Sequence, residues 1–352
     1  MVNLQNMEIA LQILAVLVAA GTFLPLIRSD VWVVRGWDFP KIQLFAAGAV
    51  LLAALLWTGV SGWWWDGAAV ALLSLALTFQ LSWMVRYTPL HKVTVPRSVG
   101  EPALKVLISN VLMSNRNGEA LVELVRRQQP DILIALEVDE WWNGQIARLA
   151  DDYPHSVELP QDDTYGMVVR SRIPLIEPRV ERLVRTNIPS VHADIRIAGD
   201  VRVHLHVVHP KPPFPDEDTS STERDAELLI VARRVEQQSG PAIVLGDLND
   251  VAWSRTTKLF QKTSGMLDPR MGRGFFNTFH AGHWWMRWPL DHVFITPHFQ
   301  VRRIERLRLD GSDHFSIYVE FCYRPSEKDE QDPPETDAAE RERVGEKIAE
   351  VR

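Results

Sequence analysis

The chain has 352 residues, one cysteine and a formal net charge of −7 at pH 7. A single cysteine excludes an intrachain disulfide, and a metal site would have to be built from oxygen and nitrogen ligands. Residues 326–352 contain ten acidic and five basic side chains, which leaves a net charge of −2 for the rest of the chain. Proteins that bind nucleic acid without sequence preference usually carry a clear basic excess, which this chain lacks.

Three apolar blocks lie near the N-terminus, at residues 9–27, 42–60 and 68–85. Each approaches the roughly 20 residues that a membrane-spanning helix needs, so we predict a membrane domain of three transmembrane helices over residues 1–87. A cleaved signal peptide is disfavoured, because the N-terminus lacks a basic region and two further blocks follow the first. Buried helices of a soluble domain are also disfavoured, since soluble helices of this length usually carry charge on one face.

Basic residues next to these blocks predict the orientation in the membrane. They lie between the first two blocks and after the third: Arg28, Arg35 and Lys41, then Arg86, Lys92 and Arg97. Residues 1–8 and 61–67 contain no Lys or Arg, and basic residues concentrate on the cytoplasmic side of membrane proteins. We therefore expect a multi-pass protein of the cell inner (plasma) membrane, with residues 63–65, all tryptophan, at the outer interface and the following domain in the cytoplasm.

Residues 88–102 contain three prolines and are predicted to form a linker to a domain at 103–325. Short apolar runs predict strands at 103–109, 132–136, 165–170, 201–208, 242–245, 290–295 and 315–321. Amphipathic spacing predicts helices at 119–129 and 222–238. Strands mixed with few helices favour an α/β sandwich with the helices outside. The acidic tail, residues 326–352, has too little apolar content for a core, so we expect disorder or a loose helix.

Carboxylate, amide and imidazole side chains lie at the ends of several predicted strands. They are Asn110, Glu137, His209, Asp247 with Asn249, Asp291, and Asp313 with His314. Hard oxygen ligands without cysteine suit Mg²⁺ or Mn²⁺ rather than structural zinc. Taken alone, the segment Gly246-Asp247-Leu248-Asn249-Asp250 uses the ordinary residues of a turn, so its meaning depends on the other strand ends.

The ordered set resembles the endonuclease/exonuclease/phosphatase superfamily, which includes DNase I-like nucleases, exonuclease III-type enzymes, neutral sphingomyelinases and inositol polyphosphate phosphatases. The resemblance covers residues 105–321 and rests on five motifs in order: Ser109-Asn110-Val111, Leu136-Glu137-Val138, Gly246-Asp247-Leu248-Asn249, Leu290-Asp291-His292-Val293 and Ser312-Asp313-His314-Phe315. Each motif is weak alone, whereas five in order within or after strands are specific. The resemblance implies a four-layered α/β sandwich of the DNase I type after the three predicted transmembrane helices.

The resemblance also implies a metal site. Glu137 would be the principal ligand of Mg²⁺ or Mn²⁺, helped by Asn110 and, from the other side, by Asp313. The sequence departs from several nucleases of the superfamily, which carry an acidic residue where Leu112 stands here. Asn115 could supply a polar group instead, but the departure weakens any close analogy to abasic-site repair enzymes.

The remaining motif residues would carry the chemistry. Asp247 would orient or deprotonate the attacking water, and Asn249 would hold a phosphoryl oxygen. Asp291 would orient His314, whose cationic ring would stabilise the charge that builds on phosphorus. His209 falls where DNase I-like and sphingomyelinase-like members carry a histidine and abasic-site endonucleases a tyrosine, so it could protonate the leaving oxygen.

Several of these residues also have a plain structural interpretation. Glu137 could be surface charge beside other acids, and His209 could be structural. We expect His292 to pack beside its neighbours without chemistry. His204 and His206 share one strand face and are predicted to be exposed or satisfied histidines outside the site.

The aromatic segment 279–288 bears on the substrate. It could stack nucleic-acid bases, enter lipid headgroups or pack on a sheet edge. The sequence predicts a membrane-anchored, divalent-metal-dependent hydrolase of phosphate esters with phosphodiesterase or nuclease chemistry, acting on nucleic acid or a phospholipid headgroup. The alternatives are a sphingomyelinase-like, lipid-directed phosphodiesterase and a binding module that has lost catalysis. Protein partners are not predicted.

Overall fold

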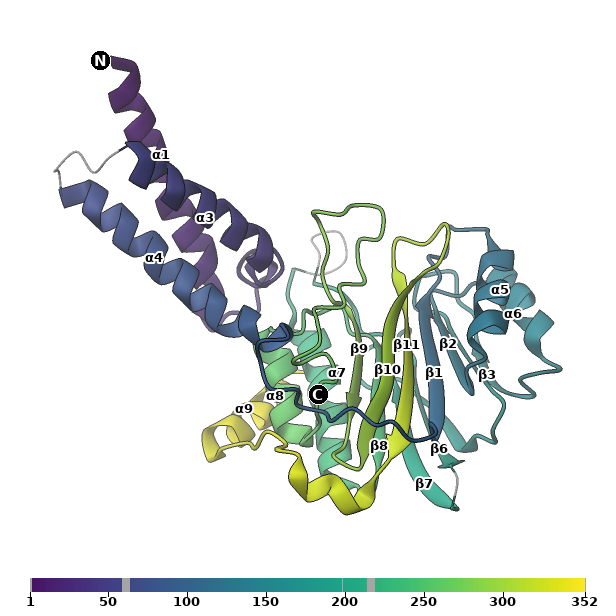
Figure 1. Ribbon diagram of the computed structural model, residues 1–352. Helices are drawn as coiled ribbons and strands as arrows, with labels where there is room; N and C mark the ends of the chain where they lie inside the picture. The colour runs from purple at the N-terminus through teal and green to yellow at the C-terminus, as the bar shows by residue number, and fades with distance from the viewer. Residues whose placement is uncertain (1, 59–63, 198, 214–218, 352) are drawn as a thin grey trace. The chain divides into compact units, whose positions relative to one another are not determined.

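The computed structural model describes residues 2–58, 64–197, 199–213 and 219–351 (Figure 1). The chain divides into two compact units, Met1–His91 with Pro213–Ser221 and Lys92–Pro212 with Thr222–Arg352. The first unit contains the long helices α1 (Val2–Phe23), α3 (Lys41–Thr58) and α4 (Trp64–Met84). Short helical turns accompany them: η1 (Leu24–Leu26), α2 (Trp32–Arg35), η2 (Gly36–Asp38) and η3 (Val85–Tyr87).

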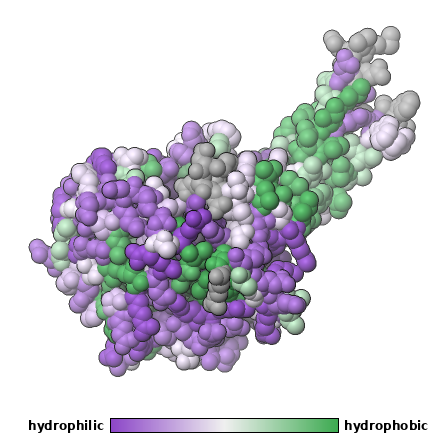
Figure 2. All heavy atoms as spheres, turned by 180° about the vertical axis from the view of Figure 1, so that it is seen from behind, coloured by the Kyte–Doolittle hydropathy of each residue, from purple (hydrophilic) through white to green (hydrophobic). Residues whose placement is uncertain are grey.

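The three long helices are apolar over a length that can cross a membrane. The spans Asn6–Leu26, Lys41–Thr58 and Trp64–Tyr87 have mean hydropathies of 2.2, 1.7 and 1.8, and Figure 2 shows hydrophobic residues over much of their surface. The prediction of three helices of spanning length and composition is confirmed. The end of the second predicted block and Trp63 of the tryptophan run lie outside the described residues.

Polar side chains join α1 to α4 within the first unit. The Gln12 amide donates to Asp66 Oδ1 at 2.6 Å, and the Gln80 amide donates to Thr22 Oγ1 at 2.6 Å. Such hydrogen bonds add to van der Waals packing between apolar helices. The helices pack around a shared apolar core.

A later segment of the chain also belongs to the first unit. The Trp32 amide donates to Thr219 O at 2.9 Å, and the Ser221 amide donates to Asp30 O at 2.8 Å. The sequence prediction had assigned this segment to the domain at 103–325, because local patterns do not report contacts between distant parts of a chain.

Two β-sheets form the centre of the second unit. One has the strand order β10-β11-β1-β2-β4-β3 and the other β5-β6-β7-β8-β9. The first is built from β1 (Leu104–Asn110), β2 (Ile132–Leu136), β3 (His155–Leu159), β4 (Met167–Ser171), β10 (Phe299–Arg308) and β11 (Phe315–Tyr323). The second contains β5 (Ile176–Glu181), β6 (Ser190–Ile197), β7 (Val201–Val207), β8 (Ala242–Asp247) and β9 (Asp291–Ile295).

Helices cover the outer face of each sheet and produce four layers (Figure 1). Side chains alternate between the two faces of a strand, so each sheet contributes one face to the core between the sheets, where Ile108 and Ile134 lie in one cluster with Leu205 and Ile243. The opposite face of the first sheet packs against α5 (Gly118–Gln128) and α6 (Glu140–Ile146), which η4 (Ala147–Leu149) follows. The opposite face of the second sheet packs against α7 (Thr222–Gln237) and α8 (Arg255–Ser264). The predicted four-layered α/β sandwich is confirmed.

The acidic tail, for which we expected disorder or a loose helix, contains helix. It forms η5 (Pro325–Glu330) and α9 (Ala338–Ala349), which begins with a capping box between Asp337 and Glu340. Val344 and Ile348 are buried in a cluster with residues of α7 and α8. Two apolar side chains one turn apart are enough to attach a short helix to an existing surface, although they could not form a core of their own.

Candidate active site

Two parallel strands deliver an amide and a carboxylate to the same end of the first sheet. Asn110 ends β1 and pairs in register with Leu136, the last residue of β2, so Glu137 follows directly beside it. Asn110 Nδ2 donates to Glu137 Oε1 at 2.8 Å and to Asp247 Oδ2, from the second sheet, at 3.2 Å. The Met113 amide donates to the other Glu137 oxygen at 3.3 Å. One amide therefore bridges carboxylates from the two sheets.

The end of β8 requires a glycine. Gly246 has a φ of +139°, and a Cβ at this position would lie 2.0 Å from the carbonyl oxygen of Val208. This close approach lets β8 run beside the end of β7 and present Asp247 to the site. The backbone amide of Asn249 then donates to Asp247 Oδ1 at 3.0 Å, and its side-chain Nδ2 donates to Pro210 O at 2.9 Å. The turn is thus shaped to hold the Asp247 carboxylate in one orientation.

Two histidines approach the same carboxylate. Asp247 pairs in register with Asp291 of β9, and His314 Nδ1 lies 2.8 Å from Asp291 Oδ2. His314 Nε2 lies 3.7 Å from Asp247 Oδ2, and His209 Nε2 lies 4.0 Å from the same oxygen. The Asp247 carboxylate is therefore the centre of the cluster.

Burial and charge set the protonation of this cluster. Burial by itself lowers the pKa of His314, but the carboxylates of Asp291, Asp247 and Asp313 outweigh it and raise this pKa to about 10. Burial raises the pKa of Glu137, against the opposing effects of His209, the Asn110 hydrogen bond and His314. His314 is therefore an imidazolium at neutral pH.

The donor set fits a small divalent cation. Carboxylate oxygens of Asp247 and Asp291 lie within 4.8 Å of each other. Asp291 Oδ1 and Asp313 Oδ1 are buried, and within the described parts of the chain neither accepts a hydrogen bond. A buried carboxylate oxygen without a donor is costly, and a cation is the partner that would satisfy it. Carboxylate and amide oxygens are the ligands that Mg²⁺ and Mn²⁺ prefer.

Comparison with known proteins agrees with this geometry. Residues 107–314, more than half of the chain, match the family model described as the Endonuclease/Exonuclease/phosphatase family. The chain belongs to this family. A search of curated proteins finds no match.

Solved structures share the fold of this endonuclease/exonuclease/phosphatase protein. TDP2 from D. rerio, solved with a single-strand DNA product, is 17% identical with a TM-score of 0.51, covering 62% of this chain and 98% of that one. The endonuclease/exonuclease/phosphatase from Beutenbergia cavernae DSM 12333 is 18% identical with a TM-score of 0.51, covering 64% and 72%. The human Nocturnin catalytic domain with bound sulfate is 19% identical with a TM-score of 0.50, covering 64% and 96%.

The structure places most of the predicted site residues of the endonuclease/exonuclease/phosphatase unit in one contact chain. Asn110, Glu137, Asp247, Asp291 and His314 are joined by hydrogen bonds or close ion pairs, as described above. The other predicted residues are less directly connected: His209 lies at 4.0 Å from the cluster, Asn249 directs one amide hydrogen to Pro210, and Asp313 leaves an unsatisfied oxygen.

Three buried residues without an assigned role orient this cluster. Ser312 Oγ donates to Asn110 O at 2.8 Å and accepts from the His314 amide at 3.0 Å, which joins the first and last motifs of the family. Thr278 Oγ1 accepts from the Asp291 amide at 3.1 Å. Arg224 Nη1 donates to Asn249 O at 2.8 Å.

The sequence offered different signals for these three residues. Ser312 stands inside a quoted motif and could have been chosen there. Thr278 and Arg224 lie in a loop and a helix with no local sign of their roles, because tertiary packing alone brings them to the site.

His292 is buried in a network of its own. His292 Nε2 donates to Asp250 O at 2.8 Å, and Arg270 Nη2 lies 2.7 Å from His292 Nδ1. The Arg270 side chain in turn donates to Asp268. As expected, His292 packs among its neighbours, and its network supports the turn that follows Asp247.

Proposed function

We propose that the second unit is a divalent-metal-dependent hydrolase of phosphate esters. The observation that carries the proposal is the buried pair of Asp291 and the cationic His314, placed beside Asp247 and the bridged pair Asn110–Glu137. An imidazolium next to carboxylates offers a positive charge for a phosphate and a base for water in the same cluster. The family membership supports this reaction class.

In this proposal Glu137, Asn110 and Asp313 would hold the metal. When bound, Mg²⁺ or Mn²⁺ would neutralise phosphate charge and polarise the bond from phosphorus to oxygen. Asp291 Oδ1, buried without a hydrogen-bond donor among the described residues, is a further oxygen available to the ion.

The proton transfers are assigned to the remaining residues. Asp247 accepts a proton from the attacking water through Oδ2, the oxygen nearest both histidines. Asn249 uses its second amide hydrogen to hold a phosphoryl oxygen, since only one of the two is taken by Pro210. His314 stabilises the negative charge that builds on phosphorus, and His209 Nε2 protonates the leaving oxygen.

The test uses the full-length protein in detergent. Hydrolysis of bis-p-nitrophenyl phosphate and of DNA is measured with Mg²⁺, with Mn²⁺ and after chelation. Asp247→Asn and Glu137→Gln should each lower kcat/KM by at least about 100-fold. Asp310→Asn, which changes a side chain with 79% exposure near the same strand ends, should not. Activity that survived both site substitutions would exclude the proposal, and Mg²⁺ binding without turnover would favour an inactive binding module.

A lipid-directed phosphodiesterase is the second candidate. Trp284 and Trp285 are 81% and 56% exposed on the segment that precedes β9. The base of this segment reaches the site, because Phe279 pairs with His314 and the Ala281 amide donates to Asp313 O. Labelled phospholipid vesicles and DNA, offered to the same preparation, distinguish the two substrate classes.

We also propose that α1, α3 and α4 cross the inner (plasma) membrane and leave the hydrolase unit in the cytoplasm. The support is their length and hydropathy, together with basic residues between the first two helices and after the third. A reporter that functions only in the cytoplasm should be active when it is fused after Arg97. A reporter active only outside the cytoplasm would reverse the orientation.

A further inference from the structure

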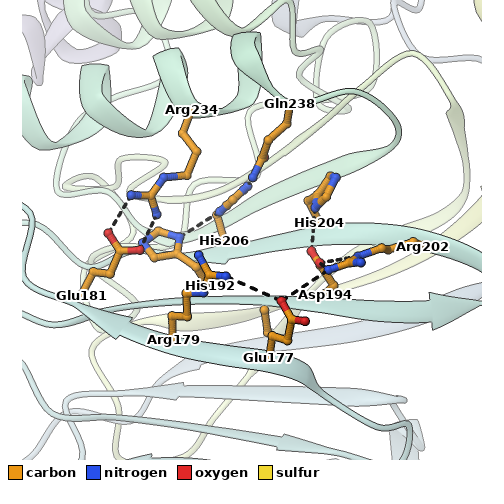
Figure 3. A pocket seen from close by; sticks show the side chains of 11 residues that line it. Glu177, Arg179, Glu181, His192, Asp194, Arg202, His204, His206, Arg234 and Gln238 are labelled. Atoms are coloured by element: carbon orange, nitrogen blue, oxygen red, sulfur yellow. Dashed lines mark hydrogen bonds and ion pairs between the residues drawn. The ribbon is translucent and has the colours of Figure 1, made fainter.

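A second group of ionisable side chains lines a pocket of about 360 Å³ on the outer face of the second sheet, beside the end of α7 (Figure 3). The register of β6 and β7 places His192 opposite His206 and Asp194 opposite His204. These even-numbered positions face away from the core between the sheets, where their odd-numbered apolar neighbours lie. The mechanism proposed above uses none of them.

The two imidazoles of the first pair point at each other. His192 Nδ1 and His206 Nδ1 are 2.8 Å apart, and the two side chains are buried. His206 Nε2 lies 3.0 Å from Gln238 Oε1, and His192 Nε2 lies 3.0 Å from Ser190 Oγ. The Ser190 hydroxyl donates to Glu181 O at 3.3 Å, so its oxygen accepts from His192. The 2.8 Å contact is a hydrogen bond whose donor is the ring that carries its hydrogen on Nδ1, and a metal ion can replace that hydrogen.

Both rings are neutral, because burial, the neighbouring imidazole and Arg234 lower the pKa of His192 to about 2, and burial lowers that of His206 to about 4. Neutral imidazole is the form that binds a metal ion. When the hydrogen of each ring is on Nε2, the two Nδ1 atoms direct their lone pairs to the same point. Histidines that bind metals almost always donate their other ring N–H to an oxygen acceptor, which is the arrangement of Ser190 and Gln238 around this pair.

We propose that His192 and His206 bind a transition-metal ion of the Zn²⁺, Ni²⁺ or Cu²⁺ class through their Nδ1 atoms. Imidazole nitrogen suits these ions, whereas Mg²⁺ prefers oxygen. Two zinc–nitrogen bonds of about 2.0–2.1 Å at a tetrahedral angle separate the nitrogens by about 3.3 Å. The observed 2.8 Å therefore has to open by only about 0.5 Å.

The other polar groups of the pocket are engaged elsewhere. His204 Nδ1 lies 2.6 Å from Asp194 Oδ1, and its Nε2 lies 3.3 Å from Ser239 O. Asp194 also pairs with Arg202. Arg234 donates to both oxygens of Glu181, at 3.0 and 2.6 Å, as Figure 3 shows. Water entering from the pocket would therefore complete the coordination.

The ion would join three elements. His192 lies on β6, His206 on β7, and Gln238, which orients His206, directly follows α7. It would therefore tie the outer helix layer to the sheet. This inference does not depend on the proposed hydrolase, whose residues stand at the strand ends.

The test measures Zn²⁺ binding to the full-length protein in detergent, by calorimetry in the presence of excess Mg²⁺. Wild type should bind one equivalent of Zn²⁺ more than His206→Gln or His192→Gln. This difference does not depend on how much Zn²⁺ the strand-end site binds, because that site is the same in all three proteins. His204→Gln is the matched control, since it changes a histidine on the same strand face that has no free nitrogen, and it should keep the equivalent. Gln238→Leu should weaken Zn²⁺ binding by about 10- to 100-fold.

A second measurement needs no substitution. Electron paramagnetic resonance of the wild-type protein with one equivalent of Cu²⁺ should show coupling to two imidazole nitrogens. Equal Zn²⁺ stoichiometry in wild type, His192→Gln and His206→Gln would overturn the proposal. A Cu²⁺ spectrum without imidazole coupling would overturn it as well, even if the histidine variants failed to fold.

Discussion

Two carboxylate–imidazole pairs of similar geometry lie among the described residues of the second unit, and one of them belongs to the candidate active site. His314 Nδ1 lies 2.8 Å from Asp291, and His204 Nδ1 lies 2.6 Å from Asp194. The far nitrogens differ: that of His314 faces the carboxylate of Asp247, whereas that of His204 faces the carbonyl oxygen of Ser239. A paired histidine is useful for chemistry when its second nitrogen faces a reactive group rather than the backbone.

The same comparison extends to charge. Burial lowers the pKa of His314, His192 and His206 alike, but carboxylates surround His314, whereas the other two face each other and Arg234. His314 therefore carries a positive charge at neutral pH, and the pair on the outer face remains neutral. Histidine therefore provides a cation at the strand ends and a neutral pair of imidazoles on the outer face.

The largest effect should come from breaking the first pair. Asp291→Asn removes the charge that holds His314 in its cationic form, and it should lower kcat for phosphodiester hydrolysis by about 10²- to 10⁴-fold. Asp194→Asn makes the same change in the second pair and should alter kcat less than about twofold. Steady-state kinetics of both variants measures the difference. Similar losses in the two variants would remove the distinction between the pairs.

A second prediction concerns a buried carboxyl group on the α7 side. Burial, with a smaller effect from Glu223, raises the pKa of Glu227 from 4.5 to about 8. Since the folded state favours the protonated form, the stabilising contribution is complete below pH 4.5 and is lost as the pH rises through about 8.

Glu227→Gln imitates the protonated form at every pH. Its Tm should match that of wild type at acidic pH and exceed it above pH 8, with a free-energy difference of a few kcal/mol, at roughly 1.4 kcal/mol per unit of pKa shift. Glu236→Gln, at an exposed position of the same helix, should show no such trend. A Tm difference between Glu227→Gln and wild type that did not change with pH would contradict the prediction.

The fold could be predicted where strands are apolar on both faces. The runs 132–136 and 242–245 are buried throughout and were identified as strands. The strands β3, β5 and β10 were missed, because they lie at or near sheet edges and alternate apolar with charged residues. β6 was missed although it is paired on both sides, since His192 and Asp194 interrupt its apolar pattern. The polar residues that form the outer pocket thus hide the strand that carries them.

The strand-end cluster could be predicted from the sequence, whereas the histidine pair of the outer pocket could not. The strand-end residues stand in ordered motifs, so their proximity could be predicted from the family resemblance. The pairing of His192 with His206 depends on the register of β6 and β7, which no local pattern encodes. The sequence prediction that His206 is an exposed or satisfied residue outside the site is consistent with its burial and hydrogen bonds.

A smaller effect should separate stability from activity. α9 packs on α7 and α8 through Val344 and Ile348, and Ile348 is 3% exposed. Ile348→Ala should lower the free energy of unfolding by about 2 kcal/mol and leave kcat unchanged, since its packing partners lie on α7 and α8. Glu342→Ala, at an exposed position of α9, is the control. Reduced kcat in Ile348→Ala at a temperature where it is fully folded would show that the outer layer and the strand ends are coupled.

The smallest effect concerns the surface next to the strand-end site. Trp284 and Trp285 are exposed on a segment whose base contacts His314 and Asp313, and the outer pocket has no comparable aromatic border among its lining residues. Tryptophan gains free energy at a lipid interface, so replacing both with alanine should lower activity on phospholipid vesicles by about 5- to 10-fold. Activity on soluble bis-p-nitrophenyl phosphate should stay the same, because both side chains are largely exposed. Trp141→Ala, an exposed tryptophan on α6, controls for loss of aromatic surface. An equal loss on both substrates would mean that the segment shapes the site, and a loss on DNA alone would assign the tryptophans to base stacking.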